Sequence, residues 1–503
     1  MASEITLSDT TAGTVRGLRH DGVHVFKGVR YGASTGGKNR FRAPQPPTPW
    51  TGAVDAFDYG APAPQLYSLS QPGLIELEHR PESEDCLFLN VWTPSLEGRR
   101  AVMVWLHAGG FFMGSGSAAV NDGTRLAAKQ DVVVITLNHR LGLFGHLDLS
   151  AYGDEFAQSR NAGVLDIVQA LEWIRDNVER FGGDPDRVMV FGESGGGWKI
   201  STLLAMKAAE GLFQRAGLQS GSRLRVDTRD AAAAKTPKVL TSLGILPTEV
   251  HRLQDMDMAE IQRLTPRIVT RPDEWQPVVD GALIDRQPFS PDAPETARWI
   301  PMIIGTTRTE NAYNLAGDGA MKGLTDLGLR QMFIQLAGER VDEALSIYRK
   351  LYPDRGNAEI AYMAHTDRSW YLDAQLLADR KARQEGAPTY FYSFERDTPV
   401  QGGRFFTPHT AELPFVFDTL ESIPQAVGPV TDAAQALADT MSAAWANFAK
   451  EGTPTAPSLP SWTEYNPGAR STMIFKEGRC EVLANPKATQ SAFWASLGSL
   501  QET

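Results

Sequence analysis

A serine set among glycines is the first residue of this chain whose surroundings could do chemistry. The pentapeptide Gly192-Glu193-Ser194-Gly195-Gly196 follows the apolar run Val188–Phe191 and precedes a stretch that favours helix. Glycine at the second position on either side of Ser194 allows a turn so tight that a Cβ would clash there. Such a turn holds the hydroxyl clear of the sheet, and the next helix points its N-terminus at developing negative charge. This strand–turn–helix context predicts Ser194 as a nucleophile, with a glycine-rich structural turn as the alternative.

A second match to the same pattern shows that the spacing alone is weak evidence. Gly32-Ala33-Ser34-Thr35-Gly36 is followed by a lysine, an asparagine and the proline-rich segment 41–50. We expect no helix to start there, because proline is excluded from helix interiors and central strands. The element after the serine therefore selects Ser194 over Ser34.

Paired glycines after an upstream strand could supply amide hydrogens to an attacked carbonyl. The run Ala101–Leu106 opens into His107-Ala108-Gly109-Gly110-Phe111. Glycine leaves the backbone N–H groups unobstructed. A turn of the Ser194 kind takes one donor from the residue after the nucleophile, here Gly195, and another from such a loop. A flexible surface turn is the alternative, but the apolar side chains that follow, from Phe111 onward, favour a pocket wall.

A serine nucleophile also needs a base, and in this chain order the base comes last. Three of the nine histidines lie beyond Ser194: His251, His365 and His409. The first two sit in segments that look helical and inserted. His409 follows the apolar run Thr389–Phe394 and a glycine-rich loop, so it can reach the serine, and we predict it as the base.

A carboxylate must orient that base. Glu310 follows the apolar run Ile300–Gly305 and could accept the imidazole N–H, which stabilises the imidazolium as His409 takes a proton. Asp280 and Asp285 are rivals, but neither follows a comparable apolar strand. We predict Glu310 as the acid.

Short apolar runs alternate with helical patterns along the chain. Runs of this length fit strands buried on both faces of a sheet; they are Ala101–His107, Val132–Leu137, Arg187–Phe191, Ile300–Gly305 and Thr389–Phe394. Residues Ala162–Arg180 and Ala433–Lys450 have helical spacing. The pattern predicts an α/β fold with a mainly parallel central sheet and helices on both faces. Segments 222–299 and 311–385 are mostly helical and read as insertions into one domain spanning 1–503.

Composition excludes several classes of protein. The chain has 503 residues and a net charge of -11, whereas proteins that follow nucleic-acid phosphates are basic. Two cysteines, Cys86 and Cys480, are too few for a disulfide scaffold. No apolar run approaches a membrane span, and the N-terminus lacks the apolar core of a secretory signal. We therefore expect a cytoplasmic protein without nucleic-acid or membrane partners; its oligomeric state stays open.

In these motifs and their order, the chain resembles the type B carboxylesterases, which include bacterial para-nitrobenzyl esterases and animal cholinesterases. The resemblance spans nearly the whole chain. Beyond the segments already described, the matching stretches are Arg40-Phe41, Ser83-Glu84-Asp85-Cys86-Leu87, Asn138-His139-Arg140, Asn161 to Asp166, Phe181-Gly182-Gly183-Asp184-Pro185, Gln219-Ser220-Gly221-Ser222, Pro277 to Gly281, and Glu412 to Phe417.

The resemblance implies an α/β-hydrolase fold with a triad and an oxyanion hole. The triad would be Ser194, Glu310 and His409, and the donors would be the N–H groups of Gly109, Gly110 and Gly195. Glu193 and Ser222 would line or support the site. Arg40 with Glu84, and Arg140 with Asp166, would form structural ion pairs, which fix geometry more reliably than they add stability.

Three positions depart from the family pattern. Ala108 replaces the first glycine of the family's loop, and we expect the hole to survive because the donors lie at the next two positions. The family's usual partner for Cys86 is missing, so the resemblance implies a free thiol and a reducing compartment. Trp198 is bulky for its place, where it could trim a pocket or pack the helix.

Together these residues predict a serine carboxylic-ester hydrolase that works through an acyl-enzyme intermediate and uses no metal or organic cofactor. Phe111 and Trp198 favour small to medium apolar or aryl esters as the small-molecule substrate, although core packing is the alternative for each ring. Two other functions stay open. One is an amide, carbamate or lactam hydrolase with the same triad, and the other is a non-catalytic, cholinesterase-like interaction protein.

Overall fold

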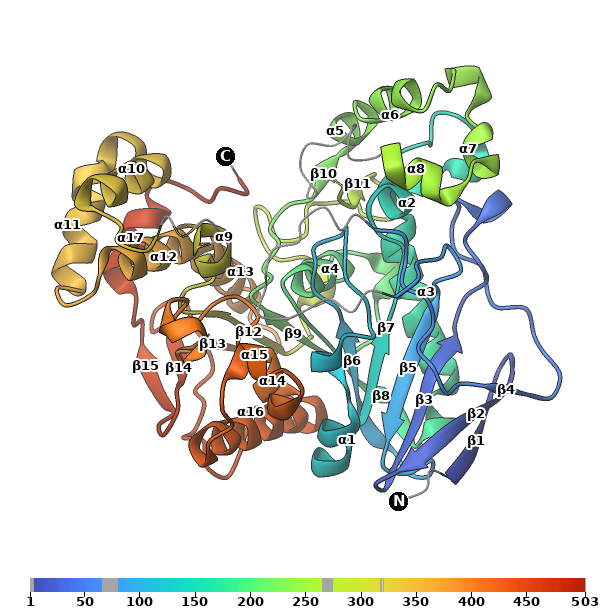
Figure 1. The fold of residues 1–503 in the computed structure, drawn as a ribbon, viewed down its shortest axis with the longest axis horizontal. Helices are drawn as coiled ribbons and strands as arrows, with labels where there is room; N and C mark the ends of the chain where they lie inside the picture. The colour runs from blue at the N-terminus through green and yellow to red at the C-terminus, as the bar shows by residue number, and fades with distance from the viewer. Residues whose placement is uncertain (1–3, 66–79, 265–274, 317–318, 320, 503) are drawn as a thin grey trace.

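A computed structural model of the chain describes residues 4–65, 80–264, 275–316, 319 and 321–502 (Figure 1). Within these residues a 13-stranded sheet has the order β1-β2-β3-β5-β7-β6-β8-β9-β12-β13-β14-β15, with β4 paired to β2. Its strands are β1 (Glu4–Thr10), β2 (Gly13–His20), β3 (Val23–Arg30), β4 (Ala53–Asp55), β5 (Phe88–Thr93), β6 (Arg100–Leu106), β7 (Val133–Leu137), β8 (Gly183–Glu193), β9 (Arg215–Gln219), β12 (Met302–Thr307), β13 (Thr389–Phe394), β14 (Ser471–Phe475) and β15 (Glu481–Ala484). The strands from β7 to β14 in this order pair in parallel.

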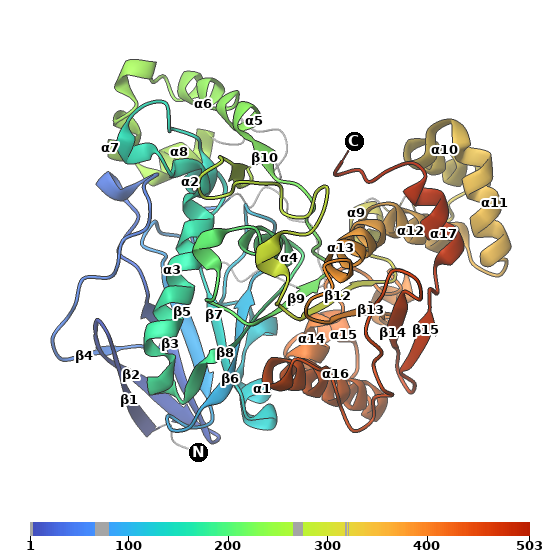
Figure 2. The ribbon, with the colours of Figure 1, turned by 180° about the vertical axis from the view of Figure 1, so that it is seen from behind.

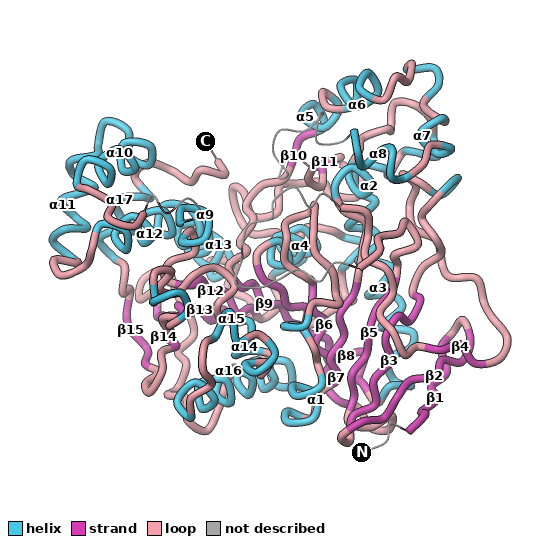
Figure 3. Tube along the Cα trace, in the orientation of Figure 1, coloured by secondary structure: helices cyan, strands magenta, loops and turns pink. Residues whose placement is uncertain are grey.

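Helices cover both faces of this sheet. They are α1 (Thr124–Gln130), α2 (Gly142–His146), α3 (Ala162–Asn177), α4 (Gly195–Leu203), α5 (Arg229–Ala233), α6 (Thr236–Ser242), α7 (Arg252–Asp255), α8 (Met258–Leu264), α9 (Ala312–Ala316), α10 (Asp326–Ala337), α11 (Val341–Leu351), α12 (Asn357–Thr366), α13 (Leu372–Ala382), α14 (Leu413–Val416), α15 (Pro424–Val427), α16 (Asp432–Glu451) and α17 (Ala488–Ala495). Figures 1 and 2 show two groups of helices on opposite sides of the molecule, α5–α8 on one and α10–α12 with α17 on the other. The tube in Figure 3 shows the strands extending across the molecule from β15 on one side to β1 on the other.

Strand β6 explains why the core has two layers. Val102 and Val104 pack with apolar residues of α3 and α4, whereas Met103 and Trp105 pack on the other face with α16. Successive side chains of a strand point to opposite faces, so a strand covered on both sides must be apolar throughout. The predicted α/β class with a mainly parallel sheet is therefore confirmed.

The two predicted long helices form with adjusted ends. The first, predicted over Ala162–Arg180, is α-helical to Asn177; a 3-10 turn, Val178–Phe181, then leads to left-handed Gly182. The second is α16, whose N-cap residue, Thr431, accepts a hydrogen bond from the Ala434 N–H. Gly452 ends it with φ 76°. Gly182 after the 3-10 turn and Gly452 after α16 both adopt the left-handed conformation, which costs glycine little.

The structure also tests the predictions for the segment after Ser34 and for the two predicted insertions. The prediction that no helix starts after Ser34 is wrong in one detail, because a three-residue 3-10 turn spans Gly37–Asn39. Segment 222–299 contains α5–α8 and also a small sheet of β10 (Asp227–Thr228) and β11 (Val278–Val279), while residues 265–274 lie outside the described part. Segment 311–385 contains α9–α13 joined by short turns, and residues 317–318 and 320 lie outside the described part. None of the helices in the described ranges has the length and apolarity to cross a bilayer.

The parallel strands bring the predicted chemical groups to one edge of the sheet. The glycine loop follows β6, Ser194 follows β8, Glu310 comes soon after β12, and His409 lies in the connection after β13. Parallel strands present their carboxyl ends together, and sites in such sheets form at that edge. The topology therefore gathers residues as distant in the chain as Gly109 and His409, which are 300 positions apart.

Candidate active site

Ser194 occupies a strained turn between β8 and α4. Its φ of 54° and ψ of -118° lie outside the regions that a residue with a Cβ prefers. The Ser194 N–H donates to the Gln219 carbonyl at 2.8 Å, which ties the turn to the end of β9. The backbone strain matches the strand-to-helix turn predicted from the sequence.

Two glycines allow this turn to lie directly against the neighbouring loop. A Cβ at Gly195 would overlap the backbone of Gly110, and a Cβ at Gly196 would overlap the carbonyl of Leu106. In the loop itself, Gly109 and Gly110 have φ values of 92° and 62°. The structure thus brings the three predicted donors together beside Ser194.

His409 and Glu310 are in direct contact. The imidazole Nδ1 lies 2.6 Å from Glu310 Oε2, and the His409 N–H donates to the Glu310 carbonyl at 3.3 Å. The other carboxylate oxygen of Glu310 accepts the Thr307 N–H at 2.7 Å. Glu310 is therefore held from the end of β12 in a position that orients the imidazole.

The second imidazole nitrogen faces the segment that carries the serine. Nε2 of His409 lies 3.1 Å from Oε1 of Glu193, the residue before Ser194. Within the described residues, no hydrogen bond joins the Ser194 hydroxyl to His409. The imidazole therefore lies between two carboxyl groups, with the nitrogen that could accept a proton turned toward the Glu193–Ser194 segment.

Four ionisable groups share this interior, and we call His409, Glu193, Glu310 and Glu412 the His409 cluster. Burial raises the pKa of Glu193 well above its usual range. Burial and the Glu310 charge raise the pKa of Glu412 to about 7. Burial alone would lower the pKa of His409, but the charge of Glu193 and the hydrogen bond to Glu310 raise it to about 9. A site with three carboxyl groups and one imidazole holds protons near neutral pH, as acid–base chemistry requires.

Sequence reasoning missed Trp370, which packs on the imidazole. The two ring centroids are 4.6 Å apart, and the indole Nε1 donates to Asn311 Oδ1 at 3.2 Å. Trp370 belongs to a π-helical turn, Asp367–Tyr371, between α12 and α13. Such turns are rare in proteins overall, but they occur often at functional sites. Apolar spacing could place this segment in a helix, but nothing in the sequence marked the extra residue that turns Trp370 inward.

The rival residues lie in other settings. His251 is largely exposed and pairs with Glu155 at 3.6 Å. His365 lies on α12, where burial lowers its pKa to about 4. The Asp280 carboxylate accepts the N–H groups of the turn that follows it, and Asp285 is exposed. The imidazole–carboxylate contact described above involves none of them.

The expected pocket residues divide between the site and the core. Phe111 is only 1% exposed and stacks edge-on against His146, so its ring packs the interior. Trp198 is half-buried, with the Arg223 guanidinium 4.8 Å from its ring centroid. Ser222 is buried near the Ser194 turn, because Gly221 before it abuts the Ser194 carbonyl. A small cavity beside the glycine loop is lined by Pro64, Gln65, Phe112, Gly142, Leu143, Phe144 and Gln262.

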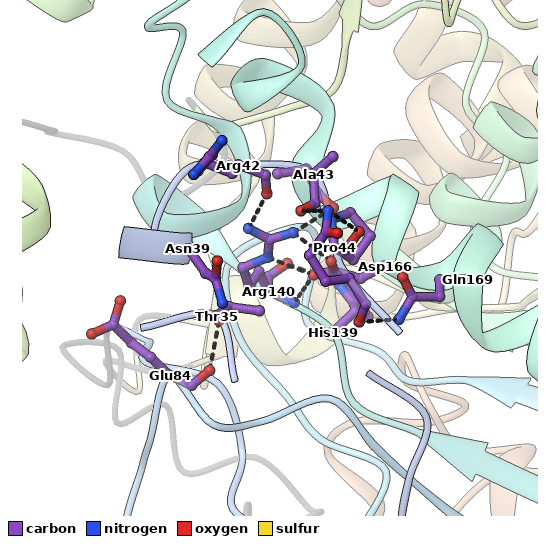
Figure 4. A network of polar contacts seen from close by, with 12 residues as sticks. Thr35, Asn39, Arg42, Ala43, Pro44, Glu84, His139, Arg140, Asp166 and Gln169 are labelled. Atoms are coloured by element: carbon purple, nitrogen blue, oxygen red, sulfur yellow. Dashed lines mark hydrogen bonds and ion pairs between the residues drawn. The ribbon is translucent and has the colours of Figure 1, made fainter. Parts of the chain in front are cut away.

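A second buried charge cluster lies close to the glycine loop (Figure 4). The Arg140 guanidinium donates to Asp166 at 2.6 and 2.8 Å and to the Arg42 carbonyl at 2.7 Å. The adjacent residue, His139, stacks on His107 with ring centroids 4.9 Å apart. We call Arg140, Asp166 and the Arg42 carbonyl the Arg140 cluster; it joins α3 and the proline-rich segment to the strand end beside the site. The implied pair of Arg40 with Glu84 also forms.

The fold and this edge of the sheet define an α/β-hydrolase. The chain matches the model of the carboxylesterase family over residues 4–494, and it belongs to that family. It is 36% identical to the para-nitrobenzyl esterase of Bacillus subtilis, an alignment that covers 92% of this chain and 94% of that protein. It is 32% identical to the phenmedipham hydrolase of Pseudarthrobacter oxydans, over 95% and 97%. The solved carboxylesterase Est55 of Geobacillus stearothermophilus is 33% identical with a TM-score of 0.83, over 97% and 100%. The chain is a serine carboxylic-ester hydrolase, and the non-catalytic alternative is not retained.

Proposed function

We propose that Ser194, His409 and Glu310 form the catalytic triad of this esterase. The observation that carries the proposal is the 2.6 Å contact between His409 and Glu310, at the edge of the sheet where the Ser194 turn abuts Gly110. A carboxylate that holds one imidazole nitrogen leaves the other to accept the serine proton. Glu193 and Ser222 line the site beside these residues.

The reaction follows from these positions. The Ser194 hydroxyl gives its proton to His409 Nε2 while its oxygen bonds to the ester carbonyl carbon. The N–H groups of Gly109, Gly110 and Gly195 hold the carbonyl oxygen as it becomes negative, and each such donor is worth about 2.7–4 kcal/mol. The tetrahedral species then expels the alcohol, which leaves with the proton from His409. Water repeats the sequence on the acyl-enzyme, releases the carboxylic acid and returns the proton to Ser194.

The proposed substrates are small to medium apolar or aryl esters. Half-buried Trp198, in the first turns of the helix that follows Ser194, supports this class. Apolar walls with few polar groups suit such ligands. An amide, carbamate or lactam hydrolase would use the same three residues, so rates on matched ester and amide substrates decide between the two reactions.

The domain organisation and the cellular location belong to the same proposal. Residues 1–503 would form one catalytic domain, because strands from both halves of the chain join one sheet, and segments 222–299 and 311–385 would be its insertions. The protein would act in the cytoplasm, where thiols stay reduced, since Cys86 and Cys480 are both unpaired and burial raises the pKa of Cys86. Fractionation of cells with an antibody against the protein tests the location.

Ser194→Ala tests the nucleophile. We expect turnover of a para-nitrophenyl ester to fall about 10⁴-fold or more, and labelling by a fluorophosphonate to disappear, without unfolding. Ser34→Ala is the matched control, because Ser34 has the same glycine spacing but is exposed elsewhere. Unchanged turnover in Ser194→Ala, or equal loss in the control, contradicts the assignment.

A further inference from the structure

A lysine is buried between the Ser194 helix and the glycine loop. Lys199 lies on α4, five residues after Ser194, and its side chain has no solvent exposure. Its Nζ donates to the His107 carbonyl at 2.7 Å, and this is the hydrogen bond that the described residues give it. His107 begins the loop that carries Gly109 and Gly110.

Burying an ammonium group in this way lowers the free energy of unfolding. Taking an ammonium out of water is unfavourable unless it is well paired, and an apolar residue of the same length would avoid that cost. Burial lowers the pKa of Lys199 well below its usual range, and the charge of Glu193 opposes this effect. The imidazoles of His107, His139 and His146 are also buried, and burial lowers the pKa of each. No acidic side chain pairs directly with Lys199 among the described residues, so stability gives no reason for a lysine here.

Among the residues that the structure describes, the other contacts between α4 and the loop are not hydrogen bonds, so they do not fix the orientation of the loop's peptide groups. Gly195 against Gly110, and Gly196 against Leu106, are close backbone approaches that limit distance but do not fix how the peptide groups are turned. A hydrogen bond to a carbonyl does fix its direction, and the carbonyl of His107 shares a peptide plane with the Ala108 N–H. His107 Nδ1 contacts the Ala108 carbonyl at 2.8 Å, so the next peptide is held from the same residue.

We propose that Lys199 is a positioning residue for the oxyanion hole: by holding the His107 carbonyl, it keeps the N–H groups of Gly109 and Gly110 directed at the ester oxygen. The inference rests on the proposed function of that loop. The lysine acts through the loop and takes no part in proton transfer. Its contribution should appear in the transition state, where the oxygen is negative, more than in substrate binding.

Lys199→Met tests this role, because methionine keeps the length and removes the donor. We expect kcat/KM for a para-nitrophenyl ester to fall about 10- to 100-fold, less than the loss of a direct oxyanion donor, with KM little changed. Affinity for a trifluoromethyl ketone, which mimics the tetrahedral species, should fall by the same factor. Lys199→Gln restores an amide donor and should recover part of both losses. Lys199→Leu is a second variant without a donor, in case methionine does not fold.

Lys381→Met is the matched control. Lys381 is equally buried and donates to the carbonyls of Arg298 and Ala387 at 2.9 and 3.1 Å, neither of which belongs to the site. It should cost stability while kcat/KM per folded molecule stays constant. If the donor-free Lys199 variants lose activity only in proportion to the folded fraction, as this control would, the proposal is overturned. A wild-type protein that a fluorophosphonate does not label would instead contradict the proposed function itself.

Discussion

The Arg140 cluster and the His409 cluster differ in the balance of their charges. In the Arg140 cluster one guanidinium meets one carboxylate, and its remaining N–H groups point to backbone carbonyls. In the His409 cluster one imidazole meets three carboxyl groups, of which Glu193 and Glu310 lie 3.1 and 2.6 Å from its two nitrogens. The carboxyl groups of both clusters are buried, whereas the His409 side chain is 19% exposed. Only the Arg140 cluster can be neutral with every group ionised.

The balance of positive and negative groups determines which role a buried cluster suits. A balanced pair acts as a fixed structural contact, because removing either charge leaves the other buried without a partner. An unbalanced cluster is expected to keep a proton on at least one of its carboxyl groups, and small changes in the local electrostatic field can move that proton. The Arg140 cluster therefore suits a structural role, and the His409 cluster suits acid–base chemistry.

The sharpest way to break the comparison is to remove the imidazole. His409→Ala should lower kcat/KM for a para-nitrophenyl ester about 10⁴-fold, because it removes the imidazole proposed to take the serine proton and return it. Thermal unfolding should change far less than activity. His365→Ala is the control; a dead His365 variant beside an active His409 variant would transfer the role to His365.

The elements at the sheet edge could be predicted because each has a local signature. The run Ala101–Leu106 is apolar throughout, as a strand covered on both faces requires. Thr389–Phe394 is mainly aromatic and is buried along its whole length. Glycines around Ser194 and at 109–110 predict close backbone approaches. Chain order limited the candidates for acid and base, and the strand before each one selected Glu310 and His409.

The rest could not be predicted because it depends on neighbours that are distant in sequence. Trp370 reaches His409 only through one extra residue in a helical turn, and Lys199 has the spacing of an ordinary helix surface residue. The inward placement of Phe111, expected to line a pocket, depends on which way the glycine loop turns. The pKa of His409 depends on three carboxyl groups from different segments of the chain. No sequence pattern predicts that these three groups lie together.

The second prediction breaks the balanced cluster. Arg140→Met should lower the free energy of unfolding by about 3–5 kcal/mol, because it leaves the Asp166 carboxylate buried without its partner. Urea titration measures the change. Replacing both partners, with Arg140→Met and Asp166→Leu together, should recover much of the loss, since no charge is then buried. Arg330→Met, which removes an exposed partner of Asp342, should leave stability unchanged. A double variant no more stable than Arg140→Met would show that the cluster's hydrogen bonds, and not its charge balance, carry its effect.

The smallest predicted effect concerns the charge next to the base. The pH dependence of kcat/KM reports the pKa of the base in the free enzyme, and activity should rise as pH increases through it, because only neutral imidazole accepts the serine proton. Glu193 raises the pKa of His409, so Glu193→Gln should move this midpoint to lower pH, by about one unit for a carboxylate in contact. Asp379→Asn alters a buried carboxylate that pairs with Arg470, and it should leave the midpoint in place. If the pH midpoint of Glu193→Gln equals that of the wild type, Glu193 is already protonated in the wild-type enzyme. The negative charge that acts on His409 would then lie on Glu310 and Glu412.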